Sequence, residues 1–196
     1  MHQKNINLVI DSTFEHAWEA EILASRPLIL PPRQFVYPAQ VEEVERGALE
    51  IMIRPFGAAP PFLATCALGF AGPAVPTGVW ACPDPAWLCA VAGGYAYLVD
   101  THDPGRWEQV VYRPVIAVTP VAEQELLIFS SFHSLLAWGR SGKAWQTSRL
   151  SWDGLNITGI RGEILFGLGW DMSSDRELEF EVNLKTGEHR GGGYLA

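Results

Sequence analysis

Apolar and polar residues alternate along much of this chain with a period of two, which is the pattern of half-buried β-strands. The clearest case is ALEIMIRP at 48–55, where Leu49, Ile51 and Ile53 point to one side and the intervening residues to the other. The wholly apolar stretch FLATCALGF at 62–70 predicts a buried strand. The pattern therefore indicates a protein built from sheets.

The N-terminal part is less regular. An apolar run at 6–10 predicts a strand at a sheet edge. Residues 12–24 fit either a helix with a capping box at its start or a strand with period-two alternation, and the alternation favours the strand. The proline-rich stretch RPLILPPRQFVYP, at 26–38, predicts extended, irregular chain. Acidic residues between Pro38 and Gly47 predict one short helix over 38–47.

One pattern recurs from about residue 88 onward. Residues 88–110 contain an apolar run, a Gly-Gly break, an alternating run, a turn, and a tryptophan that opens another strand. The same order returns at 126–150 and at 164–190, where His189 replaces the tryptophan. A period of about 40 residues suits a three- or four-stranded antiparallel sheet. Such sheets are apolar on both faces, so each must stack against a neighbour.

The predicted fold class is therefore all-β and mostly antiparallel. We expect a single domain over 1–196, made of stacked propeller-like sheets with one short N-terminal helix, and a β-sandwich remains the alternative. The repeat-like units lie at about 84–115, 121–157 and 160–195, with a possible degenerate unit at 48–82.

These units resemble the blades of quinoprotein-like β-propellers, which run from an alternating strand to a Gly-containing turn and then a tryptophan. The resemblance begins at about residue 88. AVAGGYAYLVD at 90–100 with PGRW at 104–107 is most similar, followed by LAWGRSGKAW at 136–145 and EVNLKTGEH at 181–189. The resemblance implies at least four stacked blades. It places no cofactor or metal residue in this chain.

Composition narrows the choice of partners and compartment. Apolar residues make up 48% of the chain, which weighs against disorder. The formal net charge is −8, which weighs against a nucleic-acid partner. The odd number of cysteines (Cys66, Cys82, Cys89) predicts buried, reduced thiols. No signal core or membrane span is evident, so we expect a cytoplasmic protein with no membrane partner.

Two turns carry candidate chemistry. In DTHD, Asp100, His102 and Asp103 could bind a metal, but aspartates also stabilise turns by local hydrogen bonds. In SSFHS, Ser130, Ser131 and Ser134 lie near His133, but neighbouring residues in a strand point to opposite faces. The structural interpretation is favoured for both turns.

A row of glutamates near the C-terminus also carries candidate chemistry. Glu177, Glu179 and Glu181 share one face of a predicted strand, where they could bind a cation or act as a glycosidase-like pair. A solvated strand face that deters aggregation is favoured.

The eight tryptophans are best explained by packing between sheets, with one or two left at a rim to bind a ligand. The terminal RGGGYLA, 190–196, predicts a flexible tail.

The expected function is a non-catalytic binding or scaffolding domain with no cofactor. Its expected partner is another protein, or a second copy paired through an edge strand. The alternative is an enzyme or a sugar- or metal-binding protein whose site is assembled from distant loops, because one sheet architecture hosts many functions.

Overall fold

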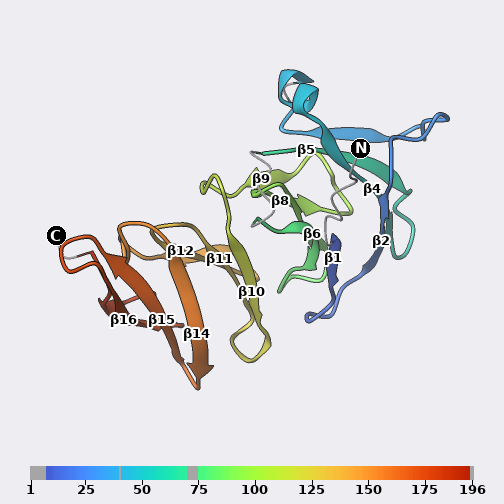
Figure 1. The fold of residues 1–196 in the computed structure, drawn as a ribbon. Coiled ribbons are helices and arrows are strands. Elements are labelled where there is room, and N and C mark those ends of the chain that lie inside the picture. The colour runs from blue at the N-terminus through green and yellow to red at the C-terminus, as the bar shows by residue number, and fades with distance from the viewer. Residues whose placement is uncertain (1–7, 40, 70–74, 195–196) are drawn as a thin grey trace. The chain divides into compact units, whose positions relative to one another are not determined.

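The computed structural model describes residues 8–39, 41–69 and 75–194 and shows an all-β protein with four small sheets (Figure 1). The chain divides into two compact units, Met1–Pro114 and Val115–Ala196. Each unit contributes two of the sheets and is described by itself. No helix in the described ranges is long and apolar enough to cross a bilayer.

The first unit holds a four-stranded and a five-stranded sheet. The four-stranded sheet has the order β2-β4-β5-β3, formed by β2 (Trp18–Leu23), β4 (Ala48–Pro55), β5 (Phe62–Ala67) and β3 (Gln34–Tyr37). The five-stranded sheet has the order β1-β6-β7-β8-β9, formed by β1 (Leu8–Asp11), β6 (Thr77–Ala81), β7 (Trp87–Ala92), β8 (Tyr95–Asp100) and β9 (Trp107–Gln109). The β1–β6 and β3–β5 pairs are parallel, and the others are antiparallel.

Buried aromatic side chains join the two sheets of the first unit. Trp18 on β2 donates from Nε1 to the carbonyl of Trp87 on β7 at 3.2 Å. The Tyr37 hydroxyl on β3 donates to the carbonyl of Pro104 at 2.9 Å, and burial raises the pKa of this phenol, so it stays a donor. Because each bond satisfies a polar atom inside an apolar interface, these aromatics contribute both area and orientation.

The second unit holds two four-stranded antiparallel meanders. One has the order β10-β11-β12-β13, formed by β10 (Ala117–Val121), β11 (Leu126–Ser130), β12 (Leu135–Gly139) and β13 (Gly142–Gln146). The other has the order β14-β15-β16-β17, formed by β14 (Leu155–Arg161), β15 (Ile164–Asp171), β16 (Arg176–Asn183) and β17 (His189–Gly191). One apolar cluster lies between them and includes Ile128, Leu135, Leu165, Phe180 and Val182.

Trp145 on β13 connects the two meanders. Its side chain is buried in the shared cluster, and its Nε1 donates to the carbonyl of Leu184 beyond β16 at 2.6 Å. Its ring also packs on Gly187, whose φ is +75°. A Cβ on Gly187 would lie 2.7 Å from the Cβ of Trp145, so the turn needs a glycine both for its backbone angle and for space.

The three recurring stretches have the same strand order. In each, the residue marked by the sequence pattern pairs with the strand before it: Trp107 with Val99, Trp145 with Ala137, and His189 with Val182. In the structure, an antiparallel run of four strands contains each recurring stretch: β6–β9, β10–β13 and β14–β17. Each run begins with a strand that precedes the recurring stretch, namely β6, β10 or β14. No tryptophan opens any of these first strands, so the sequence pattern did not include them. The region 48–82 contributes β4 and β5 to one sheet and β6 to another. The propeller and sandwich arrangements stay predictions.

The predicted helix over 38–47 is wrong. The structure has a 3-10 helix, η1 (Val41–Arg46), and a second short one, η2 (Ala122–Gln124), and no α-helix in the described residues. The Gly47 amide bonds to the carbonyl of Val44 at 2.9 Å, a three-residue step. Between Pro38 and Gly47 the chain has too few residues to repay the nucleation of an α-helix. The stop at Gly47 is confirmed, with φ at +109°.

The structure also tests the strands predicted in the N-terminal part of the chain. The strand favoured within 12–24 is confirmed over Trp18–Leu23, and the residues before it are irregular. The edge strand predicted at 6–10 is present as β1, Leu8–Asp11, and residues 6 and 7 lie outside the described part. Strand β4 has the predicted bounds, 48–55.

The glycine-rich C-terminus is not a flexible tail up to Tyr194. Residues 189–191 form β17, and the amide of Gly193 donates to the carbonyl of Leu150 at 2.8 Å. A Cβ on Gly193 would lie 2.2 Å from the backbone of Trp170. The glycines therefore allow two backbone segments to approach closely, which composition alone does not distinguish from flexibility.

Candidate functional site

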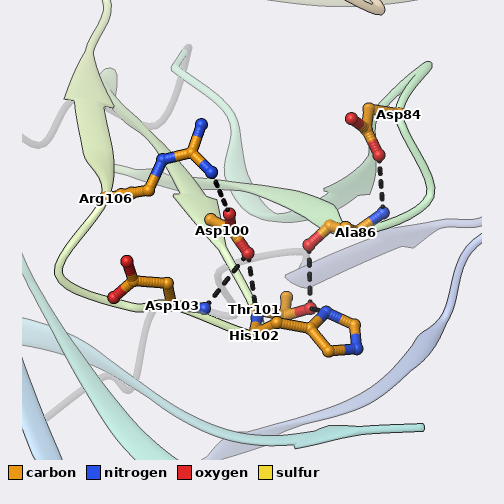
Figure 2. A network of polar contacts seen from close by, with 7 residues as sticks. All are labelled: Asp84, Ala86, Asp100, Thr101, His102, Asp103 and Arg106. Carbon is orange, nitrogen blue, oxygen red and sulfur yellow. Dashed lines mark hydrogen bonds and ion pairs between the residues drawn. The ribbon is translucent and has the colours of Figure 1, made fainter.

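The DTHD turn lies between β8 and β9 (Figure 2). Asp100 is buried, and its Oδ1 accepts hydrogen bonds from the amides of His102 at 3.0 Å and Asp103 at 3.2 Å. Its Oδ2 accepts from Nη1 of Arg106 at 3.0 Å. Both carboxylate oxygens are thus used to hold the turn closed, as in the local bonding expected of turn aspartates.

The side chains of this turn do not converge. Figure 2 shows the His102 ring and the Asp103 carboxylate pointing away from Asp100, and both residues are exposed. Thr101 donates from Oγ1 to the carbonyl of Ala86 at 2.8 Å, which ties the turn to the start of β7. No group of three or more His, Cys, Asp or Glu that could hold a metal occurs in the part of the chain that the structure describes.

The matching turn between β16 and β17 has an asparagine in place of Asp100. Oδ1 of Asn183 accepts from the amides of Lys185 at 2.9 Å and Thr186 at 3.1 Å. The same two bonds therefore form with a neutral amide. This correspondence supports a structural role for Asp100 in which the acceptor oxygen matters more than the charge.

The SSFHS turn after β11 is also held by local bonds. Oγ of Ser131 accepts from the amides of His133 at 3.2 Å and Ser134 at 3.0 Å. The His133 ring instead lies 3.3 Å, through Nδ1, from Nη2 of Arg149. The Ser130 hydroxyl is buried and has no hydrogen-bond partner in the described structure. The turn thus brings together no serine–histidine pair of the kind that nucleophilic catalysis requires.

The GLGWD stretch, 167–171, ends in another turn. Both carboxylate oxygens of Asp171 accept from the turn that follows, including a 2.6 Å bond from the Ser174 hydroxyl. This hydroxyl bond, together with the amide of Ser173, lowers the pKa of the exposed Asp171 carboxyl. Asp171 therefore stabilises the β15–β16 turn.

The acidic row lies on the exposed face of β16, as expected. Glu177 and Glu179 are exposed, and neither forms an ion pair with any described residue. Glu181 pairs with Arg190 on β17, with an N–O distance of 2.6 Å. The three glutamates stand opposite Trp170, Leu168 and Phe166 of β15, respectively.

Sequence reasoning missed the row on β15 itself. Ile164, Phe166, Leu168 and Trp170 alternate with Leu165, Gly167 and Gly169, which are buried. Since alternate residues point to opposite faces, the four large side chains share the glutamates' face, where each is half-buried. We call Ile164, Phe166, Leu168 and Trp170, together with Glu177 and Glu179, the β15 face. The alternation of large residues with glycine was the signal available in the sequence.

A shallow groove of about 420 Å³ lies on the β15 face. It is lined by Phe166, Leu168 and Glu179, and by Thr158 and Arg161 from β14. The Arg161 guanidinium carbon lies 5.6 Å from the centre of the Phe166 ring, a cation–π contact. The groove thus combines an apolar floor with charged sides.

A buried carboxylate in the first unit was also missed. Glu50 lies on the predicted polar side of β4 but is only 7% exposed. Its carboxylate accepts from Arg26 at 3.1 Å and from the Thr65 hydroxyl at 2.7 Å. Arg26 also bonds to Gln34 at 2.9 Å. Four polar side chains distant in sequence therefore satisfy one another, as a buried charge requires.

Half of the eight tryptophans are buried, which fits the predicted packing role. Trp18, Trp80, Trp138 and Trp145 are buried. Trp152 is half-buried and forms one side of a stack, in which the Arg149 guanidinium lies 4.9 Å from the Trp152 ring and 4.8 Å from the Tyr194 ring. Trp170 remains at the surface of the β15 face.

The three cysteines are free and buried, as predicted. Burial raises the pKa of each thiol, so the reactive thiolate is scarce as well as inaccessible. We expect no labelling of native protein by Ellman's reagent at pH 8 and labelling of all three thiols in urea. Rapid labelling of any thiol under native conditions would contradict this burial.

Comparisons with protein-family models, with curated proteins and with solved structures found nothing that matches this chain. The fold defines an all-β protein of four small, mostly antiparallel sheets. Its function must therefore be argued from its own surface.

Proposed function

We propose that this protein is a non-catalytic binding domain that holds a protein partner on the β15 face. The observation that carries the proposal is a row of four large apolar side chains that is only half-buried, beside two carboxylates that form no ion pair in the described structure. Apolar rows of this kind, bordered by polar groups, are typical of interaction sites.

The shape of the β15 face favours an elongated partner, either an extended chain or the tip of a projecting loop. The row follows one strand, so its side chains are spaced at two-residue steps of about 7 Å. Trp170 and Phe166 supply large aromatic surfaces, the residue types that contribute most to binding at protein interfaces. A partner of either kind laid along the row would bury both.

The charges of the β15 face indicate the chemistry of the partner. Glu177 and Glu179 border the row on one side and form no ion pair with a described residue. Arg161 lies over the Phe166 ring from the β14 side. A partner with arginine or lysine beside its apolar side chains would complement the two carboxylates, which favours specificity and association rate. We therefore expect a segment in which apolar residues are flanked by basic ones.

A random-peptide display library tests this proposal. Selection on immobilised protein is expected to enrich peptides that combine large apolar with basic residues. The double variant Glu177→Lys/Glu179→Lys should lose these peptides, since it reverses the charge beside the row. The matched control is Glu108→Lys, an exposed glutamate on β9 with no ion pair in the described structure.

Stability measurements separate loss of binding from unfolding. All three substitutions lie on solvated positions, so the free energy of unfolding should change by less than about 0.5 kcal/mol for each. Failure to enrich any peptide, or peptides that bind the double variant equally well, would contradict the proposed function.

A further inference from the structure

The connection between β2 and β3 exposes an unusual amount of apolar surface. We call residues 26–33 (RPLILPPR) the Leu28 loop. Leu28 is 103% exposed, Ile29 is 91% exposed and Leu30 is 43% exposed. Figure 1 shows this blue loop standing out from its sheet. Adjacent aliphatic side chains that are exposed to this degree are costly to keep in water, so a loop tip of this kind is typical of a binding surface.

Both ends of the Leu28 loop are fixed to the sheet. Arg26 bonds to Glu50 and Thr65, at 3.1 Å and 2.7 Å. At the other end, Arg33 donates from Nη1 to the carbonyl of Pro60 at 2.9 Å, and its guanidinium lies 5.5 Å from the centre of the Phe35 ring. Prolines inside these anchors restrict the backbone further. The tip is thus presented by a fixed base, which lowers the entropy lost on binding.

The charges beside the tip differ from those of the β15 face. The Glu50 carboxylate neutralises Arg26. Arg33 has no carboxylate partner in the described residues, so it leaves a positive charge next to the apolar tip. The β15 face has an apolar row beside Glu177 and Glu179, whose carboxylates form no ion pair within the described residues. The loop is therefore an apolar segment flanked by arginine, which is the chemistry that the β15 face favours.

We propose that the partner of the β15 face is a second copy of this chain, whose Leu28 loop lies on the row with Leu28 and Ile29 against Phe166 and Leu168. This inference rests on the proposed function. Arg33 of the loop then lies beside the acidic border. The prolines of the loop lack amide donors, so docking uses side chains and requires no strand pairing.

The contact joins two different surfaces. Two copies that exchange loops reciprocally form a closed dimer, whereas copies that do not close form an open chain. In both cases each copy supplies one loop and accepts one loop.

Sedimentation velocity over a range of concentrations measures this contact. The wild-type chain is expected to associate as its concentration rises. Leu28→Ser/Ile29→Ser removes the tip, and Glu177→Lys/Glu179→Lys alters the face; each should weaken association at least about tenfold. Val111→Ser is the matched control, because Val111 is also an exposed aliphatic residue, at 67%, outside both surfaces.

Mixing the two double variants gives the decisive result. The loop variant keeps an intact β15 face, and the face variant keeps an intact loop, so an equimolar mixture should form a 1:1 complex that neither variant forms alone. Absence of this complex, or a wild-type chain that stays monomeric at all concentrations, would overturn the inference.

The outcomes distinguish the two proposals. If the chain stays monomeric while selected peptides still bind the β15 face, the proposed function stands and the second copy is the wrong partner. If neither peptides nor the loop bind the face, both proposals fail. Co-sedimentation of the wild-type chain with phosphatidylcholine vesicles, lost in Leu28→Ser/Ile29→Ser, would assign the loop to a lipid surface and also overturn the inference.

Discussion

Replacing Trp145 with alanine is expected to lower the free energy of unfolding by about 4 kcal/mol. The side chain fills the cluster between the two meanders of the second unit, packs on Gly187 and satisfies the carbonyl of Leu184. Its removal leaves a large cavity and a carbonyl without its donor. Urea unfolding followed by circular dichroism measures the loss.

Trp145→Phe separates packing from hydrogen bonding. Phenylalanine retains much of the ring volume but cannot donate to Leu184, so we expect a loss of about 2 kcal/mol. The matched control is Trp152→Phe, because Trp152 is half-buried and its indole nitrogen forms no hydrogen bond to another described residue. Equal losses at the two positions would show that Trp145 does not join the meanders.

Replacing Asp100 with alanine is expected to lower the free energy of unfolding by about 3 kcal/mol. The substitution removes the acceptor for two amides and for Arg106. Most of the effect should come from the amides, because Arg106 is 65% exposed and water screens its ion pair. The same urea titration gives the value.

Asparagine at position 100 tests whether the charge matters. Asn183 performs the same bonding in the β16–β17 turn, so Asp100→Asn should lose only about 1 kcal/mol. His102→Ala should change stability by less than about 0.5 kcal/mol, since its ring is exposed. A large loss in His102→Ala, or equal losses in Asp100→Asn and Asp100→Ala, would reopen a functional role for the turn.

Some of the candidate chemistry could be judged from sequence because it is local. The bonds of Asp100 and Ser131 reach amides two and three residues away, so turn chemistry correctly favoured a structural role. Glu50 could not be judged in this way. The period-two alternation over 48–55 predicts that the Glu50 side chain is exposed. In the structure its carboxylate is bonded to Arg26 and Thr65, which lie 24 and 15 residues away in sequence.

The helix over 38–47 shows the limit of local signals. Pro38 and Gly47 were interpreted as helix boundaries, and Gly47 does end the segment with a positive φ. Residues 41–46 form a 3-10 helix instead, in the connection between β3 and β4 of the same sheet. The conformation of a short connection depends on where the two strands that it joins lie. Capping residues contain no information about the positions of those strands.

The order of apolar and polar residues was enough to predict where the principal strands run and which stretches share a strand order, because period-two alternation and turn residues act within a few positions. Which sheet each strand joins depended on the three-dimensional packing: β1 pairs with β6, and β6 joins the five-stranded sheet although β4 and β5 of the same 48–82 region belong to the four-stranded one. That packing also decided that the large residues of β15 are only half-buried. Pairing and exposure depend on residues far apart in the chain, so a local pattern cannot specify them.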